Sequence, residues 1–206
     1  MKYTQVSSTA FEKLQLNAGL LMTSFTPSSA TAANIFAATS GGVTFASNPQ
    51  YVDFGEDIDN VPANTKQLKK IDHYEPRMSG TAKTIDSDTV AYLEAASTKT
   101  TASGVDKFVP RHDIAATDFH DLWWVGDYTQ YNGATNGGFI AIKLINALNT
   151  GGFQVKSNDD GKGDFSFDFL GHYDISSPDT PPFEIYVKAG SAESSSSGGG
   201  TGGTTG

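Results

Sequence analysis

Alternation of apolar and polar residues, rather than a helical period, dominates this chain and predicts a protein built mostly of β-strands. In the clearest run, Phe165, Phe167 and Phe169 alternate with Ser166 and Asp168, as expected of a strand with one buried face. We expect a first strand within residues 11–25, and further strands at residues 43–46, 51–54, 105–110, 119–128, 139–148, 153–156, 164–175 and 183–188.

The longest alternation covers residues 69–85 and would span about 50 Å if it were fully extended. Tyr74, Met78 and Ala82 fall on one face of it. Pro76 cannot donate a ladder hydrogen bond, so we expect a bulge or an edge position there. The polar face of this segment carries Glu75, Arg77, Ser79, Thr81 and Lys83.

Two sets of strands have the right character to be hairpin partners. They are residues 43–54 with residues 69–85, and residues 139–148 with residues 164–175. Between the first two strands, residues 55–65 are polar and acidic, and we interpret them as a long exposed loop. Loops near this length in a compact domain usually have a function.

One helix is expected, at residues 86–96. Asp86 or Ser87 can cap its first turn, and Val90 and Leu93 form a short apolar stripe. At about three turns the helix needs a sheet to pack against.

Glycine, asparagine and serine mark the connections. Turns or loops are expected at residues 27–33, 41–42, 98–104, 129–138 and 159–164. Residues 1–10 are expected to form a flexible arm, residues 11–190 the folded domain, and residues 191–206 a Ser/Gly-rich disordered tail that has too little apolar surface to fold.

Composition excludes several classes of protein. The 206 residues carry a net charge of −9, which disfavours sequence-specific nucleic-acid binding but leaves open contact with DNA without affinity. The absence of cysteine excludes disulfides and thiolate metal sites. No apolar run approaches the ~20 residues that span a bilayer, and the first ten residues lack a signal-peptide core, so we expect folding in the cytoplasm.

The candidate chemical sites have simpler structural interpretations. His112, Asp113, Asp118, His120 and Asp121 could suggest a metal site, but their spacing matches no metal motif and neighbouring strand residues face opposite ways. We expect a polar loop that leads into a strand. Residues 159–164 resemble calcium or phosphate loops only superficially, and a hairpin turn explains them.

No catalytic constellation is present in the sequence. There is no Gly-x-Ser-x-Gly elbow, and no pair of carboxylates is distinguished from the others. His73 and His172 lie in expected strands and are expected to be structural. We therefore predict a protein that is not an enzyme and that uses neither a metal nor a cofactor.

The dipeptide Trp123-Trp124 indicates a contact surface. Because neighbouring strand residues face opposite ways, one indole is expected in the core and the other outward. An outward Trp beside Leu122 or Val125 suggests a surface that a partner covers. The alternative is that both rings pack beneath loops of the same subunit.

An ordered set of short segments resembles the major tail proteins of siphophages and of prophages of Gram-positive bacteria. The resemblance extends over roughly residues 11–190, and no single segment is diagnostic alone. The segments are residues 38–43 (ATSGGV), 53–60 (DFGEDIDN), 78–81 (MSGT), 121–128 (DLWWVGDY), 138–142 (GFIAI), 151–154 (GGFQ), 171–173 (GHY) and 182–187 (PFEIYV).

The resemblance implies a mainly β tail-tube fold, a β-sandwich or half-barrel with one short flanking α-helix and long β-hairpins. It also implies a structural virion protein whose hexameric rings stack into a tail tube, the conduit for genome ejection. The implied partners are a tape-measure protein, a tail terminator, a distal tail or baseplate protein, and double-stranded DNA that passes without specific binding. The chain would be made in the bacterial host cytoplasm and would not insert into a membrane. Some relatives carry an immunoglobulin-like domain after this region, where this chain has its Ser/Gly tail.

Two groups of residues are then candidates for function. Arg77 and Lys83 would dilute the negative charge of a tube lumen. The lumen candidates are Glu75, Arg77, Ser79, Thr81, Lys83, Ser166 and Asp168. The intersubunit candidates are Glu56, Asp57, Asp59, Asn60, Trp123 and Trp124.

Three alternatives stay open. The first is a secreted or surface carbohydrate-binding β-sandwich domain, which could also expose a Trp and acidic loops. The second is a β-rich hydrolase. The third is the inner tube of a contractile system.

Overall fold

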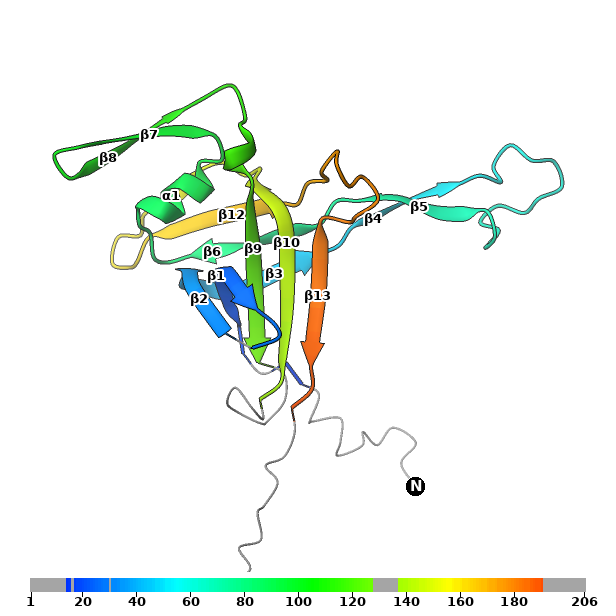
Figure 1. The fold of residues 1–206 in the computed structure, drawn as a ribbon, viewed down its shortest axis with the longest axis horizontal. Coiled ribbons are helices and arrows are strands. Elements are labelled where there is room, and N and C mark those ends of the chain that lie inside the picture. The colour runs from blue at the N-terminus through cyan, green and yellow to red at the C-terminus, as the bar shows by residue number, and fades with distance from the viewer. Residues whose placement is uncertain (1–13, 16, 30, 128–136, 191–206) are drawn as a thin grey trace, which may run out of the picture.

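The computed structural model confirms a mainly β chain with one short α-helix and a large antiparallel sheet (Figure 1). It describes residues 14, 15, 17–29, 31–127 and 137–190. The flexible N-terminal arm expected at residues 1–10, the tail at 191–206 and most of the turn at 129–138 lie outside the described residues.

The elements follow the order of the expected strands, with two additional strands, β2 and β7. In the described residues the helix is α1 (Ser87–Leu93), and a 3₁₀ turn covers Ala116–Asp118. The strands are β1 (Leu20–Thr26), β2 (Thr31–Ala37), β3 (Thr39–Ala46), β4 (Pro49–Asp53), β5 (Lys69–Tyr74), β6 (Arg77–Ala82), β7 (Ser97–Ala102), β8 (Val105–Pro110), β9 (His120–Asp127), β10 (Phe139–Asn149), β11 (Gln154–Lys156), β12 (Asp164–Leu170) and β13 (Phe183–Lys188).

The large sheet folds into two layers that share β10. One layer has the order β2-β1-β9-β10-β13, and the other contains β11-β12-β6-β3. Figure 1 shows β9, β10 and β13 running crosswise to β12 and β6. The register shifts between Leu144 and Ala147, and Asn146 has a φ of 50°, so β10 bends there and passes from one layer to the other.

The main core lies between these layers. Phe169 meets Phe36 edge to face at 5.9 Å, and α1 contributes the fully buried Leu93. Phe167 and Phe169 are buried while Ser166 is exposed, so the alternation expected for this strand is confirmed. The core comprises Leu21, Phe36, Ala37, Met78, Ala82, Leu93, Leu122, Ile142, Leu144, Ala147, Phe167 and Phe169.

The helix begins as the sequence predicts and ends earlier. The Asp86 carboxylate accepts a hydrogen bond from the Thr89 amide at 2.7 Å, which lowers the pKa of Asp86 and caps the first turn. The chain leaves the helix after Leu93 because Ala95 takes a φ of 67°, a left-handed conformation that ends helices. The expected end at residue 96 is therefore wrong by one turn.

Two expected connections are strands instead. Residues 98–104 lie largely in β7, which pairs with β8 along its whole length. This strand consists of Ser, Thr, Lys and Ala, so it lacks the apolar alternation, although β-branched threonine suits an extended chain. Residues 31–33, expected in a loop, begin β2.

The expected turn at Gly41-Gly42 is a β-bulge within β3. Both glycines have positive φ, 78° and 82°, and the register with β6 shifts between Ser40 and Val43. Only glycine takes this conformation without strain, and the extra residue lets β3 continue along β6.

The two expected hairpins have different outcomes. The first is present, because β3 pairs with β6 and β4 pairs with β5 on either side of the break at Pro76. The second is much shorter than expected, since β10 and β12 pair only at Leu148–Leu170 and Asn149–Phe169. The bend of β10 turns it away from β12, which pairs with β6 and β11, and the strand expected at 164–175 ends at Leu170.

Gly80 is a sensitive point of this packing. A Cβ added there would lie 2.8 Å from the Phe167 ring and 3.1 Å from the Gly42 carbonyl oxygen. We expect Gly80→Ala to lower the free energy of unfolding by about 1–3 kcal/mol, because the buried ring and the bulge backbone have little room to move. Gly163→Ala is the matched control, since its Cβ meets nothing closer than 3.8 Å. Urea unfolding measures both variants, and equal midpoints would contradict this account.

Candidate assembly surfaces

The outer face of the β12-β6-β3 layer is polar. Ser166 pairs with Thr81 and Asp168 pairs with Ser79, so these side chains share one side of the sheet. Because side chains alternate along each strand, this side is opposite the one that buries Phe167 and Met78. The structure brings together Arg77, Ser79, Thr81, Lys83, Ser166 and Asp168, all of the lumen candidates except Glu75.

Two ion pairs lie on this face. The Arg77 guanidinium donates to the Asp168 carboxylate at 2.7 Å. Lys83 donates to Asp164, and this hydrogen bond lowers the pKa of the Asp164 carboxyl. Each of these two carboxylates accepts from a cation of the same sheet face, but Lys156 on β11, the register partner of Asp164, is exposed and has no ion pair among the described residues, so the face keeps one unpaired cation.

A buried asparagine, Asn149, forms hydrogen bonds to the backbone of the strand that carries this face. The Asn149 side chain is 2% exposed, and its Oδ1 accepts the Asp168 amide at 2.9 Å. Its Nδ2 donates to the Leu93 and Gly152 carbonyls at 2.6 and 3.0 Å, which joins β12 to the end of α1. Sequence reasoning missed Asn149, although a polar residue that ends a long apolar run was the available signal.

Glu75 lies apart from the other lumen candidates, at the break between β5 and β6. Its amide donates to the Asn48 carbonyl at 3.2 Å, and its carboxylate is 3.6 Å from Nε2 of His73. Asp72 contacts the other ring nitrogen of His73 at 2.8 Å, and this hydrogen bond raises the pKa of the imidazole. Glu75 and His73 lie at the root of a projecting ribbon.

This ribbon, which we call the arm (residues 49–74), consists of β4, β5 and the loop between them, and it extends away from the two layers (Figure 1). Tyr51 and Ile71 are cross-strand partners on one face and are 58% and 45% exposed. Phe54 is also exposed. An isolated two-stranded ribbon is marginal in water, so an arm that exposes this much apolar surface favours a partner.

Lysines cover the aromatic rings of the arm. The Lys69 ammonium lies 5.3 Å from the centroid of the Tyr51 ring, and the Lys70 ammonium lies 5.6 Å from that of Phe54. The arm therefore combines apolar surface with positive charge along its strands.

The tip of the arm, residues 55–65, carries the acidic intersubunit candidates. Asp53 holds the tip closed, since its two carboxylate oxygens accept the amides of Gly55 and Asn64, each at 2.9 Å. Thr65 donates to the Pro62 carbonyl at 2.6 Å. The tip is thus an ordered loop that displays its exposed residues Glu56, Asp57, Asp59 and Asn60.

The two tryptophans do not form a free surface. They face opposite ways as expected, but Trp123 is only 7% exposed and packs on Phe25 and Tyr186. Trp124 packs on the main core, and its indole donates to the Ala18 carbonyl at 3.0 Å. Both rings pack within the subunit, which is the alternative left open by the sequence, although Trp124 is only half buried. The intersubunit role of Trp123 and Trp124 stays a prediction.

The His/Asp stretch forms separate local contacts. Asp118 accepts a forked pair of hydrogen bonds from Arg111, and Asp121 pairs with Lys143 at 2.7 Å. In the described part of the chain, no three His, Asp or Glu side chains are arranged to hold a metal ion. No helix among these residues is long and apolar enough to cross a membrane. His172, whose Nδ1 is 3.0 Å from the Asn146 carbonyl, has a structural contact.

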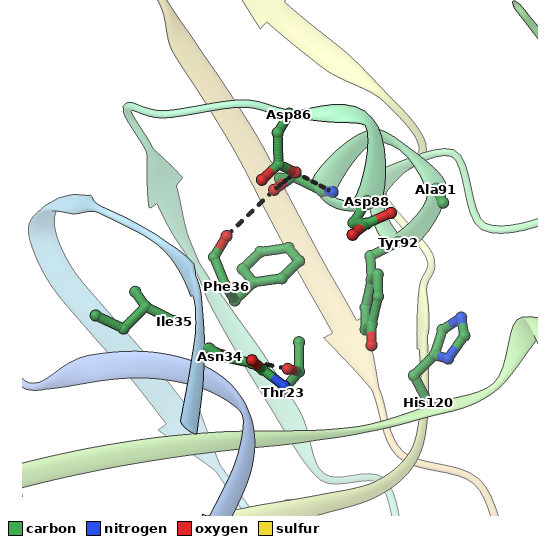
Figure 2. A pocket seen from close by; sticks show the side chains of 10 residues that line it. Thr23, Asn34, Ile35, Phe36, Asp86, Asp88, Ala91, Tyr92 and His120 are labelled. Carbon is green, nitrogen blue, oxygen red and sulfur yellow. Dashed lines mark hydrogen bonds between the residues drawn. The ribbon is translucent and has the colours of Figure 1, made fainter. Parts of the chain in front are cut away.

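A hollow of about 610 Å³ lies between α1, the β1–β2 pair and the start of β9 (Figure 2). Phe36, Ala91 and Tyr92 contribute apolar atoms to its lining, and Asp86 and Asp88 contribute carboxylates. The rest of the lining is largely polar and includes Thr23, Asn34, Thr89 and His120. The Tyr92 ring stacks on His120 with centroids 4.1 Å apart, and burial lowers the pKa of this imidazole. Sequence reasoning missed the hollow because three segments distant in the chain form it.

No known family model matches this chain, and no curated protein matches it.

The root of the arm is held by a loop from the opposite end of the chain. The Tyr74 amide donates to the Tyr173 hydroxyl at 2.8 Å, and the Gly171 amide donates to the Pro76 carbonyl at 3.0 Å. These bonds fix the direction in which the arm leaves the body.

We expect Tyr173→Phe to loosen this root, because it removes the acceptor of the Tyr74 amide. A hydrogen bond of about 1 kcal/mol corresponds to roughly fivefold faster amide hydrogen exchange at Tyr74. Tyr51→Phe, which removes a hydroxyl elsewhere on the arm, is the control and should leave this exchange rate unchanged. Unaltered exchange at Tyr74 in Tyr173→Phe would refute the role of the hydroxyl.

Proposed function

We propose that this chain is the tail tube subunit of a long-tailed bacteriophage, a structural protein whose hexameric rings stack into the conduit for genome ejection. The observation that carries the proposal is the polar, ion-paired outer face of the β11-β12-β6-β3 layer, which ends in two open strand edges. The resemblance of the sequence to siphophage tail proteins supports it independently.

The open edges provide a means of ring closure. Among the described residues, β3 is bonded only to β6, and β11 only to β12. Because all neighbouring strands of this layer are antiparallel, β3 of one copy would run antiparallel to β11 of the next. A head-to-tail contact of this kind closes into a ring and satisfies edges that would otherwise promote aggregation.

The polar face suits the lining of a DNA conduit. Each phosphate that a protein cation neutralises adds salt-dependent affinity, and affinity would slow a passing genome. Arg77 and Lys83 already have carboxylate partners on the same face, so they are less available to phosphate. The net charge of −9 adds general repulsion.

The arm would make the contacts between rings. Its ordered tip displays three carboxylates with no ion-pair partner in the described residues, which is the exposure that a contact loop needs. Tube length, closure and attachment would depend on other chains: a tape-measure protein, a tail terminator and a distal tail or baseplate protein.

The carbohydrate-binding alternative would use an exposed tryptophan together with acidic loops. Trp123 is buried and Trp124 is half buried, with its indole bonded to the Ala18 carbonyl, so the tryptophans give this alternative little support, although the acidic tip is exposed. The polar sheet face offers small side chains and ion pairs rather than an aromatic platform for a sugar ring.

Electron microscopy of concentrated protein tests the assembly directly. We expect the purified chain to form long hollow tubes. The variant Glu56→Gln, Asp57→Asn, Asp59→Asn should fold normally, because these side chains are exposed, but should form few or no tubes. The double variant Asp113→Asn, Asp179→Asn is the control, since it neutralises exposed carboxylates outside the arm. Monomers of the unaltered chain at every concentration would refute the tube, and full polymerisation of the triple variant would refute the role of the tip.

Substitution of Asp168 tests the lumen assignment. Asp168→Asn removes the partner of Arg77, and Asp168→Lys also adds a further free cation, repeated in every subunit of the tube. We expect tubes to form while DNA release slows, more for Lys than for Asn, with the delay shrinking as salt rises.

Asp113→Lys is the matched control for this experiment, because it makes the same charge change outside the polar sheet face. DNA release is measured from purified virions with a fluorescent dye. Release at the normal rate from Asp168→Lys virions would contradict the lumen assignment.

A further inference from the structure

The hollow beside α1 has a mixed lining, in which apolar atoms of Phe36, Ala91 and Tyr92 lie among polar side chains and next to the negative charge of Asp88. Asp86 caps the helix, but Asp88 is exposed and has no ion-pair partner among the described residues. Its neighbours at the hollow include the apolar surfaces of Phe36, Ala91 and Tyr92. Such a site suits a ligand with an apolar body and a cation beside it.

One face of the arm has this composition. Tyr51 and Ile71 form an exposed cross-strand pair, and Lys69 lies on the same face, next to Tyr51. The Lys69 ammonium has an amide oxygen of Asn64 at 3.0 Å and the ring as partners, and no carboxylate among the described residues. The opposite face carries Lys70, which lies over Phe54.

Figure 1 shows the arm projecting on one side of the two layers, whereas α1 and β2, which border the hollow, lie on the other side of β9 and β10. The arm therefore points away from the hollow of its own subunit. Two complementary surfaces on opposite sides of one molecule produce a head-to-tail contact, which repeats from copy to copy.

We propose that the hollow beside α1 receives the arm of a second copy of this chain, with Tyr51 and Ile71 against Phe36, Ala91 and Tyr92 and with Lys69 paired to Asp88. This inference rests on the proposed function, because the tube supplies the ordered neighbours between which the contact repeats. It goes further by naming the receiving surface.

Charge also sets how far the arm enters. The tip carboxylates Glu56, Asp57 and Asp59 would be repelled by Asp86 and Asp88. The strands of the arm, rather than its tip, therefore lie over the hollow, and the tip continues past it. The contact then removes from water an apolar pair that the free subunit exposes.

A charge exchange tests the pairing. We expect Lys69→Glu and Asp88→Lys each to raise the protein concentration needed for tube formation about tenfold or more, and the combination of both to restore it to within about threefold of the unaltered chain. Lys70→Glu, on the opposite face of the same arm, and Asp179→Lys, outside the hollow, are the matched controls and should polymerise normally. Normal polymerisation of the two single variants, or no rescue in the double variant, would overturn the proposal.

A crosslink tests the contact without requiring tubes. Because the chain has no cysteine, Ile71→Cys and Ala91→Cys each introduce a single thiol. We expect mild oxidation of their mixture to give a disulfide-linked pair between the two variants, at a yield well above that of Ala91→Cys mixed with Ile175→Cys, whose thiol is far more exposed.

The two experiments separate the two proposals. Tubes without the specific crosslink would refute the arm-in-hollow contact and leave the tail tube function intact. The crosslink without tubes would support the contact and refute the tube. A crosslink yield no higher than that of the Ile175→Cys control would indicate random collision and would also overturn the contact.

Discussion

The backbone at the edges of the β11-β12-β6-β3 layer is the constraint on which the rest of the structure depends. A strand edge presents amide and carbonyl groups that need partners, and nature usually blunts such edges or covers them. Here β3 and β11 are open in the described residues, and the four strands between and including them alternate in direction. That alternation makes the two edges complementary to each other, so a repeat of the same chain is the simplest partner.

The bend in β10 makes the polar face possible. If β10 stayed straight, it would continue in one flat layer with β9 and β13. The shift at Asn146 instead carries its end across to β12, so the two layers enclose a core between them and each keeps one outer face. Phe167 and Phe169 supply the inner side of β12, which leaves Ser166 and Asp168 outside. Asn149 then satisfies the backbone where the layers meet.

The sequence predicts the parts of this fold that depend on local pattern. The phenylalanine alternation of β12, the Asp86 cap and the break at Pro76 are all readable along the chain. The β7 strand was missed because threonine and serine give it no apolar period, and the bulge at Gly41-Gly42 was mistaken for a turn because two glycines suit either. The hollow and the packing of both tryptophans within the subunit depend on which distant segments meet, and no local pattern contains that information.

The distribution of charge differs between the sheet face proposed to line the tube and the surfaces proposed to join one copy to the next. Arg77 and Lys83 on the polar sheet face have carboxylate partners within the same subunit, so these two cations gain little from binding anything further. Lys69 and Lys70 on the arm instead lie over aromatic rings, and Asp88 in the first turn of α1 has no ion-pair partner among the described residues, so these groups gain most from a neighbour. A charge compensated within the subunit resists binding, whereas a charge left uncompensated next to exposed apolar surface promotes it. The same acidic chain can therefore line a tube that binds passing DNA weakly and still form strong contacts between its copies.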